Sequence, residues 1–144
     1  KKKKSITEQD DTVLEALNLY GMHLGTAFQL VDDVLDYNAD ADQLGKNIGD
    51  DLAEGKPTLP LIYAMQHGSE HQTQLIRDAI EHCNGMEHLD EILAALKHTN
   101  ALEFTMEKAE QEANKAIACL DCLAESSYKQ ALISLARIAV DRDH

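Results

Sequence analysis

The stretch Phe28-Gln29-Leu30-Val31-Asp32-Asp33-Val34-Leu35-Asp36-Tyr37 places three aspartates in the pattern DDxxD. Apolar residues recur upstream of it at steps of three and four, which predicts a long helix that ends near this stretch. At about 100° per residue, Asp36 lies about 40° around that helix from Asp32, and Asp33 lies about 100° from it. We therefore expect all three carboxylates to open onto one face. Such charges repel one another unless a divalent cation neutralises them, and a set of oxygen ligands without Cys or His favours Mg²⁺.

A second signal follows at a fixed distance along the chain. It reads Gly45-Lys46-Asn47-Ile48-Gly49-Asp50-Asp51-Leu52-Ala53-Glu54-Gly55-Lys56-Pro57-Thr58-Leu59-Pro60. DDxxD alone occurs by chance in acidic helices, so only its combination with the two Gly-Lys pairs makes the match specific. Together the two segments resemble the trans-isoprenyl diphosphate synthases (polyprenyl synthetases), whose second aspartate-rich region reads FQxxDDxxD and then GKxxGxDxxxGKxTLP. The match is densest over residues 21–64, and the C-terminal tail is similar to that of the long-chain members.

The resemblance implies an all-α fold, an antiparallel helix bundle of which residues 1–144 form the C-terminal half. The second aspartate-rich motif would span residues 32–36, and residues 38–56 would form a lid loop. The family condenses isopentenyl diphosphate with an allylic diphosphate such as farnesyl diphosphate. A long-chain product of octaprenyl length, the size of a quinone side chain, is expected.

The resemblance also implies roles for individual residues. Asp32 and Asp36 would bind Mg²⁺ directly. Asp33 would either bind the same ion or contact one of its ligands. Asp51 would hold a metal ion through a water molecule. Lys46 and Lys56 would grip the allylic diphosphate as compact positive charges. Gln29 would lie beside the substrates and Phe28 at the isopentenyl tail. Phe28 also falls on an apolar stripe, so packing in the core is an equally good reading of it, and surface lysines are the alternative for Lys46 and Lys56.

One part of the family's pattern is missing from this sequence. The first aspartate-rich motif and the arginines that hold isopentenyl diphosphate do not occur here. The chain is therefore expected to be a fragment, or one of two chains, and to lack prenyl-transfer activity by itself. Half a bundle also leaves apolar helix faces uncovered, which predicts a homodimer or pairing with the missing N-terminal half.

Three other interpretations remain open. The chain could be a non-catalytic helical subunit of a heteromeric prenyl synthase, but such a subunit is expected to have lost its aspartates. It could also be an acidic helical bundle with solvated carboxylates, which would bind no diphosphate. DDxxD alone would permit a terpene cyclase, against which the two lysine motifs argue.

Composition restricts the function classes. The chain has 144 residues and a formal net charge of −13, which argues against a nucleic acid as partner. It has neither a run of about 18 apolar residues, as a membrane span requires, nor a recognisable signal peptide. Three cysteines form no disulfide framework, so a reducing compartment, the cytoplasm, is expected.

The pattern predicts six helices. On the first, we expect one buried stripe of residues, which are Leu14, Leu17, Gly21, Leu24, Phe28, Val31 and Leu35. Turn-forming residues then predict an irregular stretch over 38–56. A helix from Thr58 to His67 follows, and Ser69 with Gln72 forms a capping box for the next. Two more helices precede the last one, which begins at Ser126-Ser127 and is expected to turn Leu132, Leu135 and Ile138 inward.

Overall fold

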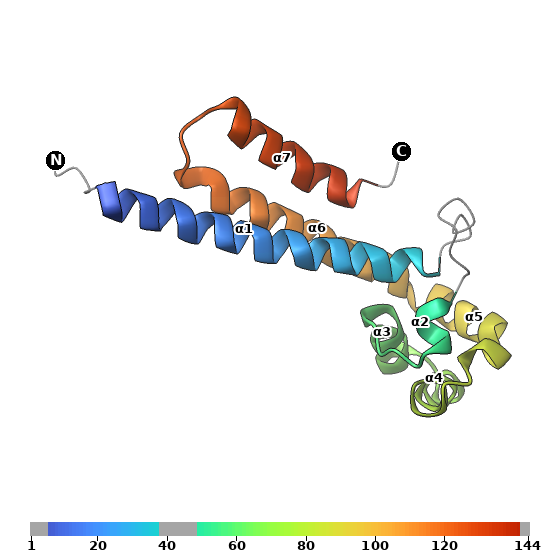
Figure 1. Ribbon diagram of the computed structural model, residues 1–144. Helices are drawn as coiled ribbons and strands as arrows, with labels where there is room; N and C mark the ends of the chain where they lie inside the picture. The colour runs from blue at the N-terminus through green and yellow to red at the C-terminus, as the bar shows by residue number, and fades with distance from the viewer. Residues whose placement is uncertain (1–5, 38–48, 142–144) are drawn as a thin grey trace. The chain divides into compact units, whose positions relative to one another are not determined.

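The computed structural model describes residues 6–37 and 49–141, and all of the secondary structure it assigns there is helical (Figure 1). The helices are α1 (Ile6–Leu35), α2 (Asp50–Ala53), α3 (Leu59–His67), α4 (Glu70–His82), α5 (Leu89–Thr99), α6 (Ala101–Cys119) and α7 (Ser127–Val140). Two short 3₁₀ helices, η2 (Gly85–His88) and η3 (Leu120–Cys122), complete the set. The prediction of an all-α fold is confirmed.

The chain forms two compact units, which are Lys1–Gln29 with Lys108–His144, and Leu30–Glu107. The core of the first unit joins α1, α6, η3 and α7. Its buried residues are Tyr20, Leu24, Ala116, Leu120, Ala136 and Ala139. Tyr20 also donates a hydrogen bond from its hydroxyl to the carbonyl of Leu132, at 2.7 Å. Small alanines on α6 and α7 let the helix backbones approach closely, and the long side chains of α1 fill the remaining space.

The second unit packs the short helices α2 to α5 around an aliphatic core. Leu52, Leu61, Ile76, Ile92 and Leu96 come from four different helices and are almost fully buried. Each fully buried aliphatic side chain of this size stabilises the fold by about 1.5–3 kcal/mol. This core fixes α2, which follows the end of α1 by way of residues 38–48, against the rest of the unit. It thereby holds the segment of residues 49–56 in place.

Local signals predicted the helix starts well. Ser69 and Gln72 form both bonds of the predicted capping box, at 3.2 and 2.9 Å. Ser126 caps α7 by accepting from the backbone N–H of Lys129. Thr58 and Gly68 flank α3 as expected. Each side-chain cap satisfies a backbone N–H that would otherwise have no partner at the helix start.

The predicted buried faces of the first and last helices were right at Leu17, Leu24 and Leu132, which belong to the core of the first unit or pack against it, and wrong at several other positions. On α1, Leu24 of the predicted stripe is buried, but Leu14, Gly21 and Phe28 are exposed, and the other buried apolar positions are Ala16, Tyr20, Ala27 and Val34. On α7, Leu135 and Ile138 are 43% and 58% exposed, while Ala136 and Ala139 are buried. Both helices carry apolar residues over more than one face, and the face that packs is the one with alanines.

The predicted irregular stretch over 38–56 is only partly described. Residues 38–48 lie outside the described residues, and 49–56 contain the single turn of α2. Among the helices that the structure describes, we find none with the length and apolar character needed to cross a membrane.

Candidate functional site

The last turn of α1 is joined to the segment that leads into α2. The backbone N–H of Gly49 donates to the carbonyl of Asp36 at 2.8 Å. The backbone N–H of Asp51 donates to both carboxylate oxygens of Asp36, at 3.3 and 3.2 Å. Gly49 has a φ of +85°, a left-handed conformation that glycine adopts without strain. The glycine of the second motif therefore turns the chain so that Asp51 meets Asp36.

Asp51 in turn holds the backbone of the segment that leads to Lys56. Its carbonyl accepts hydrogen bonds from the backbone N–H groups of Lys56, at 3.0 Å, and Glu54, at 3.2 Å. Gly55 bends the chain between them with a φ of +71°. The Lys56 side chain is exposed. The backbone of Asp51 thus links the Asp36 carboxylate, 15 residues earlier in the sequence, to the backbone N–H of Lys56.

The three aspartates of DDxxD differ in burial. Asp33 and Asp36 are buried, whereas Asp32 on the same helix is exposed. Of the three residues expected on one face, only Asp32 is exposed. Because the buried carboxylate of Asp36 lies against Asp51 and Asp33 lies on the same helix, this part of the molecule concentrates negative charge, and a cation in it would be stabilised.

A phenol lies among these carboxylates. Burial, and then the charge of Asp36, raises the pKa of the Tyr37 hydroxyl well above its usual range. Asp51 and Asp33 raise the same pKa further, while the hydroxyl of Thr58 acts in the opposite direction. The phenol is therefore protonated and remains a hydrogen-bond donor. Sequence reasoning missed Tyr37 and Thr58, although one directly follows the DDxxD motif and the other lies two residues after Lys56.

The remaining predicted site residues belong to the first unit or fall outside the described residues. Phe28 and Gln29 are on α1 in the first unit, and both are exposed. With 47% of its surface exposed, Phe28 does not pack in the core of the described residues. Lys46 lies outside the described residues, so its predicted role stays a prediction.

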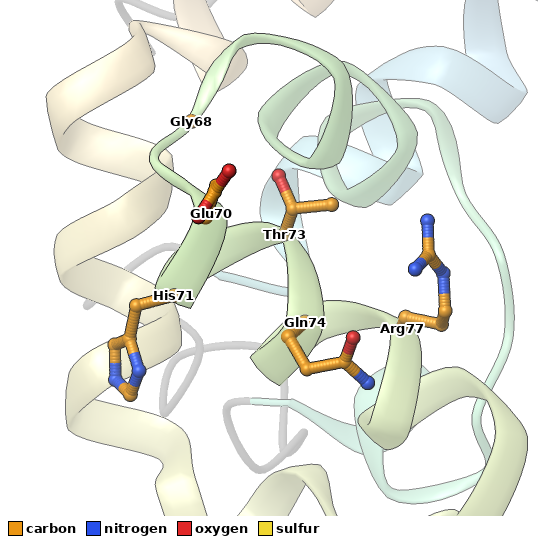
Figure 2. A pocket seen from close by; sticks show the side chains of 6 residues that line it. All are labelled: Gly68, Glu70, His71, Thr73, Gln74 and Arg77. Carbon is orange, nitrogen blue, oxygen red and sulfur yellow. The ribbon is translucent and has the colours of Figure 1, made fainter.

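A separate depression lies on α4. It has a volume of about 550 Å³ and is lined by Gly68, Glu70, His71, Thr73, Gln74 and Arg77. Figure 2 shows His71 at one end and Arg77 at the other, with Glu70 and Thr73 between them. Its charges are mixed, and His71 is already paired with Glu91 at 3.2 Å. None of the predicted site residues that the structure describes lines this depression.

A second group of potential ligands also lies on α4. Asp78, Glu81 and His82 offer ligand atoms within 4.8 Å of one another, at a spacing that the sequence alone could have revealed. They are largely exposed, and Asp78 already accepts a hydrogen bond from Gln74 at 2.8 Å. Exposed acidic groups of this kind are common without a metal ion.

Comparisons with known proteins point to one family. A family model described as polyprenyl synthetase matches residues 4–99. Octaprenyl diphosphate synthase from Escherichia coli (strain K12) is 57% identical over 129 residues, which are 90% of this chain and 40% of that protein. The chain therefore spans about two fifths of the length of this relative.

Solved structures agree with the sequence comparison. A polyprenyl synthase from Caulobacter crescentus CB15, complexed with calcium and isoprenyl diphosphate, superposes with a TM-score of 0.81 at 38% identity, over 90% of this chain and 40% of that one. A geranylgeranyl pyrophosphate synthase from Corynebacterium glutamicum, complexed with isoprenyl diphosphate and magnesium, gives a TM-score of 0.79 at 30% identity, over 91% and 38%. The described fold is that of these isoprenoid synthases.

Proposed function

Because this chain belongs to the polyprenyl synthetase family, we propose that it is the C-terminal half, residues 1–144, of a long-chain prenyltransferase. Its part in the reaction is to hold the diphosphate of an allylic substrate while isopentenyl diphosphate is added. The observation that carries this proposal is the linked arrangement of Asp36, Asp51 and Lys56.

The reaction begins when the allylic C–O bond breaks and leaves an allylic cation and inorganic diphosphate. The alkene of isopentenyl diphosphate then attacks the cation, and loss of a proton restores a double bond. Diphosphate leaves only if its growing negative charge is compensated. We assign part of that task to Lys56, whose exposed ammonium can reach phosphate oxygens, and a second part to Lys46.

A divalent cation fits the residues that are present. Asp32, Asp33, Asp36 and Asp51 form a donor set of oxygens only, which suits Mg²⁺ or Ca²⁺. When bound, such an ion would neutralise diphosphate charge and orient the leaving group. Mg²⁺ is our proposal because it shares its coordination shell readily with phosphates. Solved relatives hold calcium or magnesium with isoprenyl diphosphate, which supports this choice.

The finer assignments are proposals as well. Farnesyl diphosphate as primer, Phe28 and Gln29 as substrate contacts, residues 38–56 as a lid and octaprenyl diphosphate as product all extend the family resemblance. High identity to an octaprenyl diphosphate synthase supports the product length. Three free cysteines support a cytoplasmic location. A non-catalytic subunit is the weaker alternative, because all three aspartates of DDxxD are intact.

The test is calorimetric binding of farnesyl diphosphate to the 144-residue chain, with and without Mg²⁺. We expect binding that requires Mg²⁺ and weakens in Asp32→Ala and Lys56→Ala. Matched controls are Asp50→Ala and Lys97→Ala, which remove exposed charges of the same sign on α2 and α5. Absence of binding by a folded chain, or equal weakening by the controls, would contradict the proposal.

We further propose that this chain alone transfers no prenyl group, because the first aspartate-rich motif is not in its sequence. The measurement is elongation of farnesyl diphosphate by the purified chain, with a complete octaprenyl diphosphate synthase as positive control. Detectable elongation by the chain alone would overturn this point.

A further inference from the structure

Two cysteines of the first unit lie one helical turn apart beside a small hollow. Cys119 is the last residue of α6 and Cys122 is the last residue of η3. Both are free thiols. The hollow has a volume of about 250 Å³, and the six residues that line it are Thr12, Glu15, Ala16 and Leu19 of α1 together with Cys119 and Cys122. Both cysteines therefore border one space that a small ligand can enter.

The turn that carries the two cysteines is fixed in the fold. Leu120, which lies between them, is fully buried in the core of the first unit, and Cys119 packs against that core. The backbone N–H of Leu123 donates to the Leu120 carbonyl at 2.9 Å and closes the 3₁₀ turn. Cys122 is exposed, and its Sγ lies 4.0 Å from the Cys119 carbonyl oxygen. The Cys122 side chain is thus folded back toward Cys119 along a turn that packing holds in place.

Helix geometry decides which chemistry this spacing suits. Residues three apart on a helix have Cβ atoms about 5–6 Å apart, whereas a disulfide needs about 3.5–4.5 Å. A disulfide between the two cysteines would therefore require the backbone of this turn to move. A metal ion bridges a wider gap, because metal–thiolate bonds are about 2.3 Å long and two sulfurs on one ion can lie up to about 4.6 Å apart. The pair consequently fits a bound metal ion better than an S–S bond.

The donor set decides which ion fits. Among the residues that the structure describes, the two cysteines belong to no group of three His, Cys, Asp or Glu ligands within 4.8 Å of one another. Structural zinc sites use four protein ligands, and Mg²⁺ and Ca²⁺ take oxygens. Thiolates instead select soft ions, and Cu(I) is the soft ion that two thiolates alone can satisfy.

We propose that Cys119 and Cys122 form a binding site for a soft monovalent metal ion, Cu(I), at the end of α6. On binding, the two thiols lose their protons and the two sulfurs become the ligands, so that one ion is bound and two protons are released to water. The site belongs to the first unit, whereas Asp36, Asp51 and Lys56 belong to the second. The inference is therefore independent of the proposed function.

The experiment measures binding of Cu(I) to the 144-residue chain by competition with a chromogenic Cu(I) chelator, without oxygen and with a reductant that is not a thiol. We expect one ion per chain. Cys119→Ser and Cys122→Ser should each weaken binding by more than about hundredfold, because loss of a ligand exceeds the cost of losing one of its outer partners. Cys83→Ser is the matched control. That cysteine is exposed in the second unit, where its Sγ donates to the Glu54 carbonyl at 3.4 Å.

X-ray absorption of the copper-loaded chain supplies a second readout. We expect two sulfur neighbours around the ion and no nitrogen or oxygen neighbour. Circular dichroism checks that each variant is folded. Cys122→Ser is the decisive variant, because Cys122 is exposed and its substitution leaves the core unchanged.

The outcomes decide the proposal. Binding to the wild-type chain that is no tighter than binding to Cys122→Ser would overturn it, because a single thiol would then explain the result. Equal loss of binding in Cys83→Ser would also overturn it, since the ion would then be held by a thiol of the second unit. Mg²⁺-dependent binding of farnesyl diphosphate should be the same in the wild type and in Cys122→Ser, so failure of either proposal leaves the other intact.

Discussion

At the scale of single residues, Gly55 is the most constrained position near the site. Its φ is +71°, and a Cβ there would lie 2.7 Å from the carbonyl oxygen of Ile80 and 2.9 Å from the Cys83 sulfur. Gly55→Ala is therefore expected to lower the free energy of unfolding by about 1–3 kcal/mol. Denaturant unfolding measures this change.

Gly21→Ala is the matched control for Gly55→Ala. Gly21 is exposed within α1, and an added Cβ meets no atom of the described residues within 4 Å. Alanine there should raise stability by about 0.5–1 kcal/mol, because it lowers the entropy cost of the helix. Equal effects of the two substitutions would contradict the steric account of Gly55.

The ion pair between α1 and α6 predicts a dependence on pH. Glu112 accepts from His23 at 2.9 Å, and Lys115 lies 2.9 Å from its other oxygen. The hydrogen bond from His23, and then that from Lys115, lowers the pKa of Glu112 below 4.5. The pairing therefore stabilises the folded state above that pH, and this stabilisation is lost as the pH falls through the lowered pKa.

Glu112→Gln should consequently reduce the loss of stability on acidification. The effect is expected to be below about 1 kcal/mol, because the pair is partly exposed. Unfolding curves at several acidic pH values measure it, with Glu110→Gln on the same helix as the control. An unchanged acid dependence in Glu112→Gln would rule out this contribution.

At the scale of elements, the rotation of α7 about its axis decides which of its apolar residues are buried and so affect stability. Ala136 is fully buried, while the larger neighbour Leu135 is 43% exposed. We expect Ala136→Leu to overpack the core and cost about 1–3 kcal/mol. Leu135→Ala should change stability by less than about 0.5 kcal/mol, as surface substitutions usually do. Denaturant unfolding of both variants measures the difference, and the reverse order would support the register expected from the sequence.

The same helix shows what the sequence could predict. Helix starts such as Ser69 with Gln72 depend on atoms three residues apart, so local pattern was enough. The buried faces of α1 and α7 depend on which partner packs there. Leucine is more hydrophobic than alanine, so a sequence pattern favours the leucine face as the buried one. In the structure, alanines line the helix–helix contacts, because small side chains let the helices approach closely. The contact between Asp36 and Asp51 spans 15 residues, and only the fixed distance between two motifs indicated it.

At the scale of the whole molecule, uncovered apolar surface predicts association. Large apolar side chains are exposed on both α1 and α7, and they include Leu14, Met22, Phe28, Tyr128 and Ile138. Monomeric proteins seldom leave such side chains uncovered together. We therefore expect the chain to self-associate, or to pair with the half of the synthase that its relatives carry in addition.

Sedimentation of the purified chain over a range of concentrations measures this association. Met22→Gln combined with Leu14→Gln should shift the equilibrium toward the monomer without unfolding the chain, because both side chains are exposed. A matched double variant at exposed polar positions, Asn114→Gln with Glu110→Gln, should leave it unchanged. A wild-type chain that stays monomeric at every concentration would count against the prediction.

The main chain and the side chain of Asp51 have separate roles. Its amide and carbonyl connect Asp36 with Lys56, and these bonds are available to any residue except proline, which has no N–H. The carboxylate of Asp51 can therefore be substituted while its backbone hydrogen bonds remain. A change of side chain at this position can alter the chemistry while the turn keeps its shape. Substitutions of this side chain can therefore be tested without disturbing the backbone bonds that join Asp36 to Lys56.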